Sequence, residues 1–125
     1  MVVWYIEDIV PYEGTITLDT PNVEVTVIEL TDIGKYYMVT GYLDLSDMLS
    51  VNEIDMKEYI DLGEGTYKKY LTYKYRGEQL DPIIMLTPKY FTPNDNYKLT
   101  LTLLTGTSLQ IPYKILLFKY NYREV

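Results

Sequence analysis

Tyrosines and basic residues are crowded into the segment from Gly65 to Gly77, which reads GTYKKYLTYKYRG. The segment holds four tyrosines and four lysines or arginines. Aromatic rings combined with cations bind single-stranded nucleic acid, because bases stack on the rings while the cations neutralise phosphates. Exposed tyrosines also stack on sugar rings, so a carbohydrate is a second class of ligand that this composition suggests.

Strand parity divides the segment into two faces, since alternate side chains of a strand point to opposite sides of a sheet. The odd positions are mostly aromatic or apolar and predict a face turned to the core: Tyr67, Leu71, Tyr73 and Tyr75, with Lys69 as the exception. The even positions predict an exposed basic face, whose candidate ligand-binding or partner-binding residues are Lys68, Tyr70, Lys74 and Arg76. The net charge of −7 argues against nucleic acid, because domains that bind it carry a basic footprint.

A second group of reactive side chains is acidic and lies between Asp44 and Glu64, where seven carboxylates accompany one lysine. Paired carboxylates hydrolyse glycosidic bonds, and clustered carboxylates bind hard cations such as Ca²⁺. The spacing matches no EF-hand loop, so we interpret the segment as a solvated acidic face and predict no metal site. A carboxylate-dependent hydrolase is the third functional hypothesis.

Other catalytic residue types are scarce in this chain. It has no histidine and no cysteine, and its three serines lie outside any nucleophile-elbow pattern. Without histidine or cysteine, neither a serine triad nor a cysteine triad can be assembled. No glycine-rich phosphate loop follows a predicted strand. The sequence therefore predicts a protein that is not an enzyme, with no catalytic residues and no cofactor.

The elements that would position these residues are strands. Alanine, the best helix former, is absent, whereas tyrosine occurs fifteen times and favours strands. Alternation is clearest in residues 97–105, where one face carries Tyr97, Leu99, Leu101 and Leu103. Residues 22–31 alternate and then change phase, which predicts a β-bulge or a crossing between sheets. Residues 36–45 alternate through Gly41, which predicts a weak point or a bulge.

Residues 15–18 and 109–122 complete the predicted strands. Pro112 predicts that the early part of 109–122 lies at a sheet edge, because proline cannot donate to a ladder. At most one short helix is expected, near residues 46–53, with an irregular loop followed by a strand as the alternative. Turn residues between short strands predict a single domain, 1–125. Its expected fold is all-β, a two-sheet antiparallel β-sandwich of the jelly-roll or Greek-key type.

Charge is distributed unevenly along the chain. Residues 1–66 contain fourteen acids and two lysines, whereas residues 67–125 contain nine basic residues and four acids. We favour the interpretation that strands from the two halves interleave, so that these charges mix in space. Fifteen tyrosines exceed what a core of this size needs, and exposed tyrosine is typical of protein interfaces. We therefore expect a homo-oligomer or a complex with another protein.

The N-terminus has no basic region, and its apolar run ends at Glu7, so neither a secretory signal nor a membrane-spanning segment is predicted. The chain is rich in tyrosine and isoleucine, small, and free of cysteine, histidine and alanine. In this composition it resembles the small orphan proteins of viruses that infect hyperthermophilic archaea. The resemblance transfers no functional residue. It implies a virion component or an accessory factor, found in the cytoplasm of the producing cell or in the virion.

From these observations the leading functional hypothesis is a non-catalytic structural or protein-interaction domain that self-associates. The alternative is a module that binds carbohydrate or single-stranded nucleic acid through exposed tyrosines. No membrane partner is expected.

Overall fold

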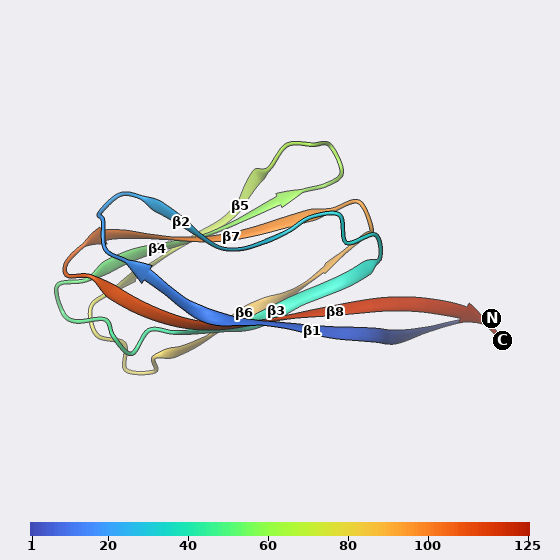
Figure 1. Cartoon of the computed structure of the whole chain (residues 1–125), viewed down its shortest axis with the longest axis horizontal. Coiled ribbons are helices and arrows are strands. Elements are labelled where there is room, and N and C mark those ends of the chain that lie inside the picture. Colours follow the sequence, from blue (N-terminus) through green and yellow to red (C-terminus); the bar gives the residue numbers. More distant parts are fainter.

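The computed structural model describes residues 1–125 and contains eight β-strands and no helix. The strands are β1 (Val2–Leu18), β2 (Glu24–Leu30), β3 (Tyr36–Asp44), β4 (Glu53–Asp61), β5 (Lys68–Arg76), β6 (Ile83–Phe91), β7 (Asn96–Thr105) and β8 (Leu109–Glu124). Sheet A has the strand order β1-β8-β3-β6, and sheet B has the order β2-β7-β4-β5. The two antiparallel sheets pack face to face (Figure 1), which confirms the predicted sandwich.

The strands pair as a long hairpin folded on itself. β1 pairs with β8, β2 with β7, β3 with β6 and β4 with β5. Rolling up this nested hairpin adds the pairs β3–β8 and β4–β7. Eight strands connected in this way form a jelly roll. The β1–β2, β3–β4, β5–β6 and β7–β8 connections consequently share one end of the sandwich, which we call the loop end, opposite the chain termini (Figure 1).

The inward side chains of both sheets form one core of 21 buried hydrophobic residues. The predicted alternation in residues 97–105 is confirmed, because Tyr97, Leu99, Leu101 and Leu103 are all buried. β7 lies between β2 and β4, so side chains of both neighbours also cover much of its other face. A central strand is therefore more completely buried than the half-exposed strand that its alternation predicts.

The irregularities predicted within residues 22–31 and at Gly41 both coincide with shifts in strand register, the second with its extra residue on β6. The register of β2 against β7 shifts between Thr26 and Ile28, and that of β3 against β6 shifts between Val39 and Gly41. Gly41 also lies against the backbone of β8, where a Cβ atom would approach the Lys114 carbonyl oxygen to 2.3 Å. Only glycine fits at so close a contact between neighbouring strands.

Residues 46–52 form turns, so the loop alternative is observed and the short helix is not. Asn52 is buried, and its side chain binds two segments of backbone. Its side chain accepts a hydrogen bond from the Leu49 N–H (2.9 Å) and donates one to the Thr107 carbonyl (2.8 Å). These bonds tie the β3–β4 connection to the β7–β8 connection.

The prediction that Pro112 places the early part of residues 109–122 at a sheet edge is confirmed locally: β8 lies between β1 and β3, but its residues 109–112 pair with β1 alone. Pairing of β8 with β3 ends at Tyr113, so the missing N–H of Pro112 falls beyond that ladder. β1 is also much longer than the strand predicted at residues 15–18. It begins at Val2, and its first residues extend past the body of the sandwich together with the end of β8 (Figure 1).

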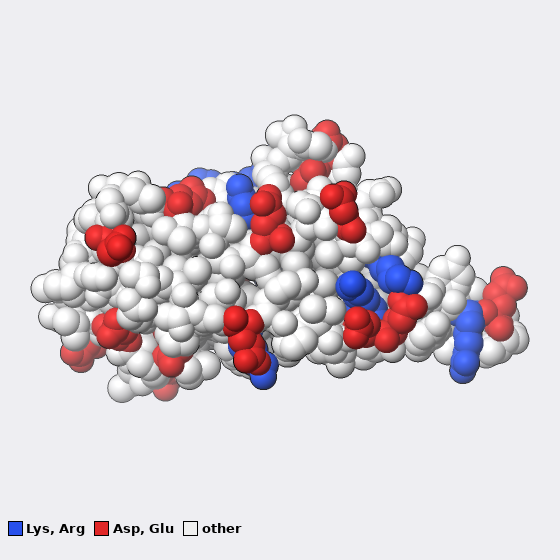
Figure 2. All heavy atoms as spheres, viewed as in Figure 1, with Lys and Arg blue, Asp and Glu red and all other residues white.

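Each nested pair joins a strand of the acidic half to a strand of the basic half. Four of the five ion pairs accordingly connect the two halves. Figure 2 shows acidic and basic side chains over the same surface. The charge asymmetry along the sequence therefore disappears in space, as predicted. The structure has no helix long and apolar enough to cross a membrane.

Candidate interaction surface

The outward side of sheet A is apolar, although the outward side of a sandwich sheet normally meets water and is polar. The strand registers place nine exposed, large apolar side chains on it: Trp4, Ile6, Ile9, Tyr36, Tyr42, Ile83, Met85, Tyr90 and Tyr122. The half-buried Met38, Leu116, Phe118 and Tyr120 lie between them. We call this set the apolar face. Within it, Lys114 and Glu13 form an ion pair at 3.3 Å, so their charges largely cancel.

The outward side of sheet B shows the opposite character. Its registers align charged residues and threonines from all four strands: Glu24, Glu29, Asp55, Lys57, Thr72, Lys74, Lys98 and Thr100. The hydroxyls of Thr100 and Tyr59 each donate a hydrogen bond of 2.6 Å to the Glu24 carboxylate. These bonds lower the pKa of Glu24, the one from Thr100 most. Sheet B is therefore polar outside in the ordinary way, and sheet A is not.

The apolar face continues onto a two-stranded arm, which we define as residues 2–6 paired with residues 120–124. β3 begins at Tyr36, opposite Tyr120, so beyond this point β1 and β8 have only each other (Figure 1). Trp4 packs against Tyr36 and Tyr122, with ring centroids 5.1 and 5.0 Å apart. The arm is closed at its tip, where the Val125 N–H donates a hydrogen bond to the Met1 carbonyl (2.9 Å).

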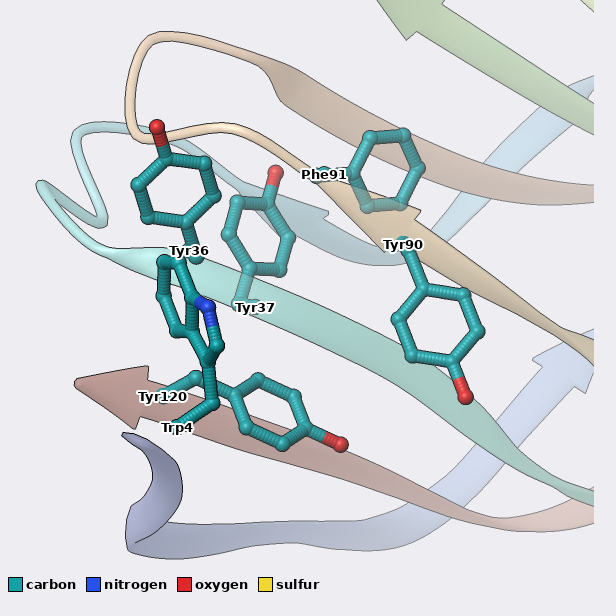
Figure 3. A pocket seen from close by; sticks show the side chains of 6 residues that line it. All are labelled: Trp4, Tyr36, Tyr37, Tyr90, Phe91 and Tyr120. Carbon is teal, nitrogen blue, oxygen red and sulfur yellow. The ribbon is translucent and has the colours of Figure 1, made fainter. Parts of the chain in front are cut away.

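An open pocket of about 430 Å³ lies where the arm meets the body. Aromatic side chains alone line it (Figure 3): Trp4, Tyr36, Tyr37, Tyr90, Phe91 and Tyr120. Two of these, Tyr37 and Phe91, belong to the core, where their rings stack at 5.0 Å. The walls carry no charged group, so the pocket suits an apolar or aromatic group that a partner supplies.

The four sequence-predicted binding residues do not share one face. The register of β4 against β5 shifts between Glu58 and Tyr59, and Tyr70 is left unpaired in β5. This bulge reverses the parity of β5 along its length. Lys68 lies opposite Ile60, which packs against the core. Lys68 and Tyr70 thus line one pocket of about 230 Å³ near the β4–β5 turn.

Lys74 and Arg76 lie farther along β5, on the outward side of sheet B. Lys74 is opposite Asp55, and the Arg76 Nε lies 2.7 Å from a carboxylate oxygen of Glu53. Lys68 has an acidic neighbour as well, at 3.7 Å from Glu64. Carboxylates of the acidic segment therefore accompany all three cations. A binding role for Lys68, Tyr70, Lys74 and Arg76 stays a prediction.

The expectation that the odd face of β5 enters the core was wrong for most of its residues. Leu71 is 38% exposed and Tyr73 is 53% exposed. They lie opposite Glu58 and Met56 and so point to the inner side of sheet B. β5 is an edge strand, however, and Figure 1 shows that its hairpin with β4 rises away from the body. Sheet A does not cover it, so its inner side is left open.

An ion pair that the sequence did not reveal joins the two sheets inside the sandwich. A carboxylate oxygen of Glu58, on β4, lies 2.8 Å from the Nζ of Lys89, on β6, and both side chains are buried. Lys89 also donates a hydrogen bond to the Thr87 carbonyl. The nearby Tyr97 hydroxyl is buried without a hydrogen-bond partner. Burial, followed by the Glu58 carboxylate, raises the pKa of Tyr97.

The carboxylates of residues 44–64 do not converge, and no three of them approach as a metal-binding cluster. Two of them stabilise turns. Asp44 accepts hydrogen bonds from the hydroxyl and the N–H of Ser46, which lower its pKa. Burial alone would raise the pKa of Asp61, but bonds from the Asn96 amide and from backbone N–H groups, including that of Glu64, lower it.

The apolar face left a signal in the sequence. The positions between the core residues of β3 and β8 are aromatic or aliphatic where a half-exposed strand would have polar residues, as at Tyr36, Tyr42 and Phe118. The signal for the buried ion pair is Glu58, which interrupts the apolar series of Ile54 and Met56 on β4. Neither signal shows which residues lie next to one another, because the apolar face and the Glu58–Lys89 pair both depend on which strands the topology brings together.

No protein-family model matches the chain, and no curated protein matches it. A chain in a solved structure of infectious bursal disease virus, Gx strain, is similar with a TM-score of 0.50 and 12% identity. That match covers 100% of this chain and 36% of the viral chain. A chain from the Gt strain of the same virus gives a TM-score of 0.47 and 13% identity, over 95% of this chain and 33% of that one. The present chain thus spans about a third of the length of the chains that it matches, and the likeness shows the fold alone.

Proposed function

We propose that this protein is a non-catalytic structural domain that assembles with copies of itself through the apolar face. The contrast between the two sheets carries the proposal. Sheet B presents charges and threonines to water, whereas sheet A presents a continuous surface of aromatic and aliphatic side chains. Soluble monomers rarely expose an apolar surface larger than a few hundred Å². A surface of this kind marks a contact with another protein.

The size of the surface fits a stable contact. Four strands about 4.8 Å apart and nine residues long, at about 3.4 Å per residue, cover about 590 Å². The arm, with two strands of five residues, adds about 160 Å². The total of about 750 Å² is close to the roughly 800 Å² that each partner contributes to a standard interface. The body of sheet A falls short by itself, so the arm belongs to the same contact.

Charge directs a contact between two copies to the apolar face. The protein carries a net charge of −7, so two copies repel each other over most of their surfaces. The apolar face carries few charges: Lys114 and Glu13 are paired with each other, and the Asp44 carboxylate at its loop end accepts hydrogen bonds from Ser46. A basic partner would instead be drawn to the acidic surface elsewhere on the molecule, which Figure 2 shows on both layers.

We extend the proposal to a viral protein that is a component of a virion or accessory to its formation. The composition supports this, since the chain resembles small proteins of archaeal viruses in lacking cysteine, histidine and alanine. The jelly-roll topology supports it as well, because viral capsid domains commonly have this fold. The solved chain with a similar fold at a TM-score of 0.50 comes from a structure of a virus.

Light scattering over a concentration series tests the proposal with a matched pair of variants. Met85→Glu places a charge on the apolar face, and Thr72→Glu places one on the outward side of sheet B; both positions are exposed and lie on edge strands. We expect the wild type and Thr72→Glu to gain mass with concentration, while Met85→Glu remains a monomer. A wild-type protein that stays monomeric at high concentration would rule out self-assembly.

A further inference from the structure

We propose that the second copy packs antiparallel on the first, so that the arm of each copy covers the loop end of the other's apolar face. This inference rests on the proposed function and adds the orientation of the partner and the segment that occupies each part of the face. The two copies are then related by a two-fold axis that crosses the strands, and each arm contacts the partner near Tyr42 and Lys114.

The arm itself requires a partner. An isolated pair of strands is at best marginally stable in water, and the arm has no neighbouring strand beyond Tyr36 and Tyr120. Three of its large side chains are about half exposed: Trp4, Ile6 and Tyr122. Packing this side against a second copy would bury the rings and hold the ribbon in place. The body of the same molecule cannot do so, because the arm extends past it (Figure 1).

Strand order decides between the two face-to-face arrangements. If the two-fold axis ran along the strands, β1 of one copy would face β6 of the other, and β8 would face β3. The arms continue only β1 and β8, so they would then extend side by side with their apolar sides uncovered. If the axis crosses the strands, β1 and β8 of one copy face β1 and β8 of the other. Each arm then lies against the partner's body, at its opposite end.

The loop end offers a place for the arm's aromatic rings. With the two-fold axis at Phe118, the row of Tyr122 in one copy reaches the row of Lys114 and Tyr42 in the other. A hollow of about 190 Å³ lies there, and its lining includes Tyr42, Asp44, Ile83, Pro112 and Lys114. The Lys114 side chain is half exposed and, besides pairing with Glu13, places there a cation that favours aromatic faces. Trp4 and Tyr122 provide such faces.

Charge favours the same arrangement. The loop end, in residues 19–23, 44–53, 77–82 and 105–109, carries six carboxylates and no lysine or arginine. The arm end, in residues 2–8, 31–36, 62–67, 92–95 and 118–124, carries six carboxylates and three basic residues: Lys35, Lys119 and Arg123. The axis along the strands would set two acidic loop ends side by side. The axis across them places each acidic loop end beside an arm end that is less acidic and has cations.

Disulfide cross-linking tests the orientation, because the chain has no cysteine of its own. Two single-cysteine variants, Tyr122→Cys and Tyr42→Cys, are mixed and oxidised. We expect a mixed disulfide between the two chains. Tyr122→Cys mixed with Thr72→Cys, on the outward side of sheet B, should give none. A disulfide of Tyr122→Cys with itself, in place of the mixed product, would show the other orientation and overturn the inference.

The single tryptophan gives a second measurement on the unmodified protein. Trp4 is about half exposed in one copy, and the arm places it against the partner's loop end. We expect its fluorescence to move to shorter wavelength, and its quenching by acrylamide to fall, over the concentrations at which light scattering shows assembly. Trp4→Ala should weaken the self-association constant about 1,000-fold, because the two-fold dimer loses two interfacial aromatic hot spots worth about 2 kcal/mol each.

The outcomes separate this inference from the proposed function. Assembly without a change in Trp4 fluorescence and without the mixed disulfide would leave the structural role standing and refute the arm's place in it. A protein that remains monomeric in light scattering would refute both. Far-ultraviolet circular dichroism of each variant confirms that it has kept its sheet content, so that loss of assembly is not loss of folding.

Discussion

The buried ion pair between Glu58 and Lys89 allows a stability prediction that follows from its position. Replacing Lys89 by methionine keeps most of the side-chain volume and leaves the Glu58 carboxylate, which is 1% exposed, without its cation. Breaking a buried pair in this way costs about 3–5 kcal/mol. A domain of this kind is stable by about 5–15 kcal/mol, so Lys89→Met should remove a large share of the free energy of unfolding.

Urea unfolding measures this cost. With a slope of about 2 kcal/mol per molar urea, the midpoint of Lys89→Met should fall by about 2 M. Arg76→Met is the matched control, because Arg76 pairs with Glu53 at 2.7 Å but is 71% exposed. An exposed pair contributes about 0–1 kcal/mol, so this variant should unfold near the wild-type midpoint. Equal midpoints for the two variants would refute the claim that the Glu58–Lys89 pair is desolvated.

The double variant Glu58→Leu with Lys89→Met tests the physical cause. Replacing both charges by apolar groups removes the desolvation penalty together with the attraction. The double variant should therefore match the wild type or exceed it by about 1–4 kcal/mol. A double variant as unstable as Lys89→Met alone would show that packing around the Lys89 side chain, rather than an unpaired Glu58 charge, explains the loss.

Two further predictions concern pH and packing. The chain has no histidine or cysteine, so the free energy of unfolding should be flat between about pH 6 and 9. The free energy of unfolding should fall below about pH 4, because the pKa of Glu24 is lowered in the folded state, and again above about pH 10, because the hydrogen bond to Glu24 raises the pKa of Tyr59 to about 12. Thermal melts measure this profile, and a change in stability near pH 7 would contradict the assignment. Gly41→Ala should destabilise the fold by about 2–3 kcal/mol, because the new Cβ would lie 2.3 Å from a β8 carbonyl oxygen. Gly65→Ala is the control: no atom lies within 4 Å of its new Cβ, so it should cost about 1 kcal/mol for the positive φ alone. Equal urea midpoints for the two variants would refute the close contact at Gly41.

The sequence was a good guide to the strands, because period-two alternation and turn residues are local. Residues 97–105 lie in β7, and the register shifts near Thr26 and Gly41, where irregularities were predicted. A strand follows the β3–β4 loop, as the alternative to the short helix predicted. Each of these features is determined within about ten residues along the chain.

The candidate site was less predictable, because it depends on contacts between distant strands. The basic face predicted for β5 assumed unbroken alternation, and a bulge at Tyr70 separates Lys68 from Lys74 and Arg76. Period-two alternation also does not show whether the other sheet covers the inner side of an edge strand. Tyr73 lies on that side of β5 and is exposed because sheet A does not cover it. The apolar face is assembled from four strands in the order β1-β8-β3-β6, and that order is a property of the rolled hairpin as a whole.

The tyrosines divide by environment in a way that suits a protein that must be soluble before it assembles. Tyr37 and Tyr97 are fully buried and pack with Phe91 in the core, while Tyr36, Tyr42, Tyr90 and Tyr122 lie outward on sheet A. A tyrosine buries a large apolar ring in a contact but keeps a hydroxyl that water can solvate in the free protein. Leucine or isoleucine in the same positions would bury similar area without that hydroxyl, and the free face would promote non-specific aggregation. On the proposed contact face tyrosine meets both requirements, and four of the seven exposed tyrosines lie there.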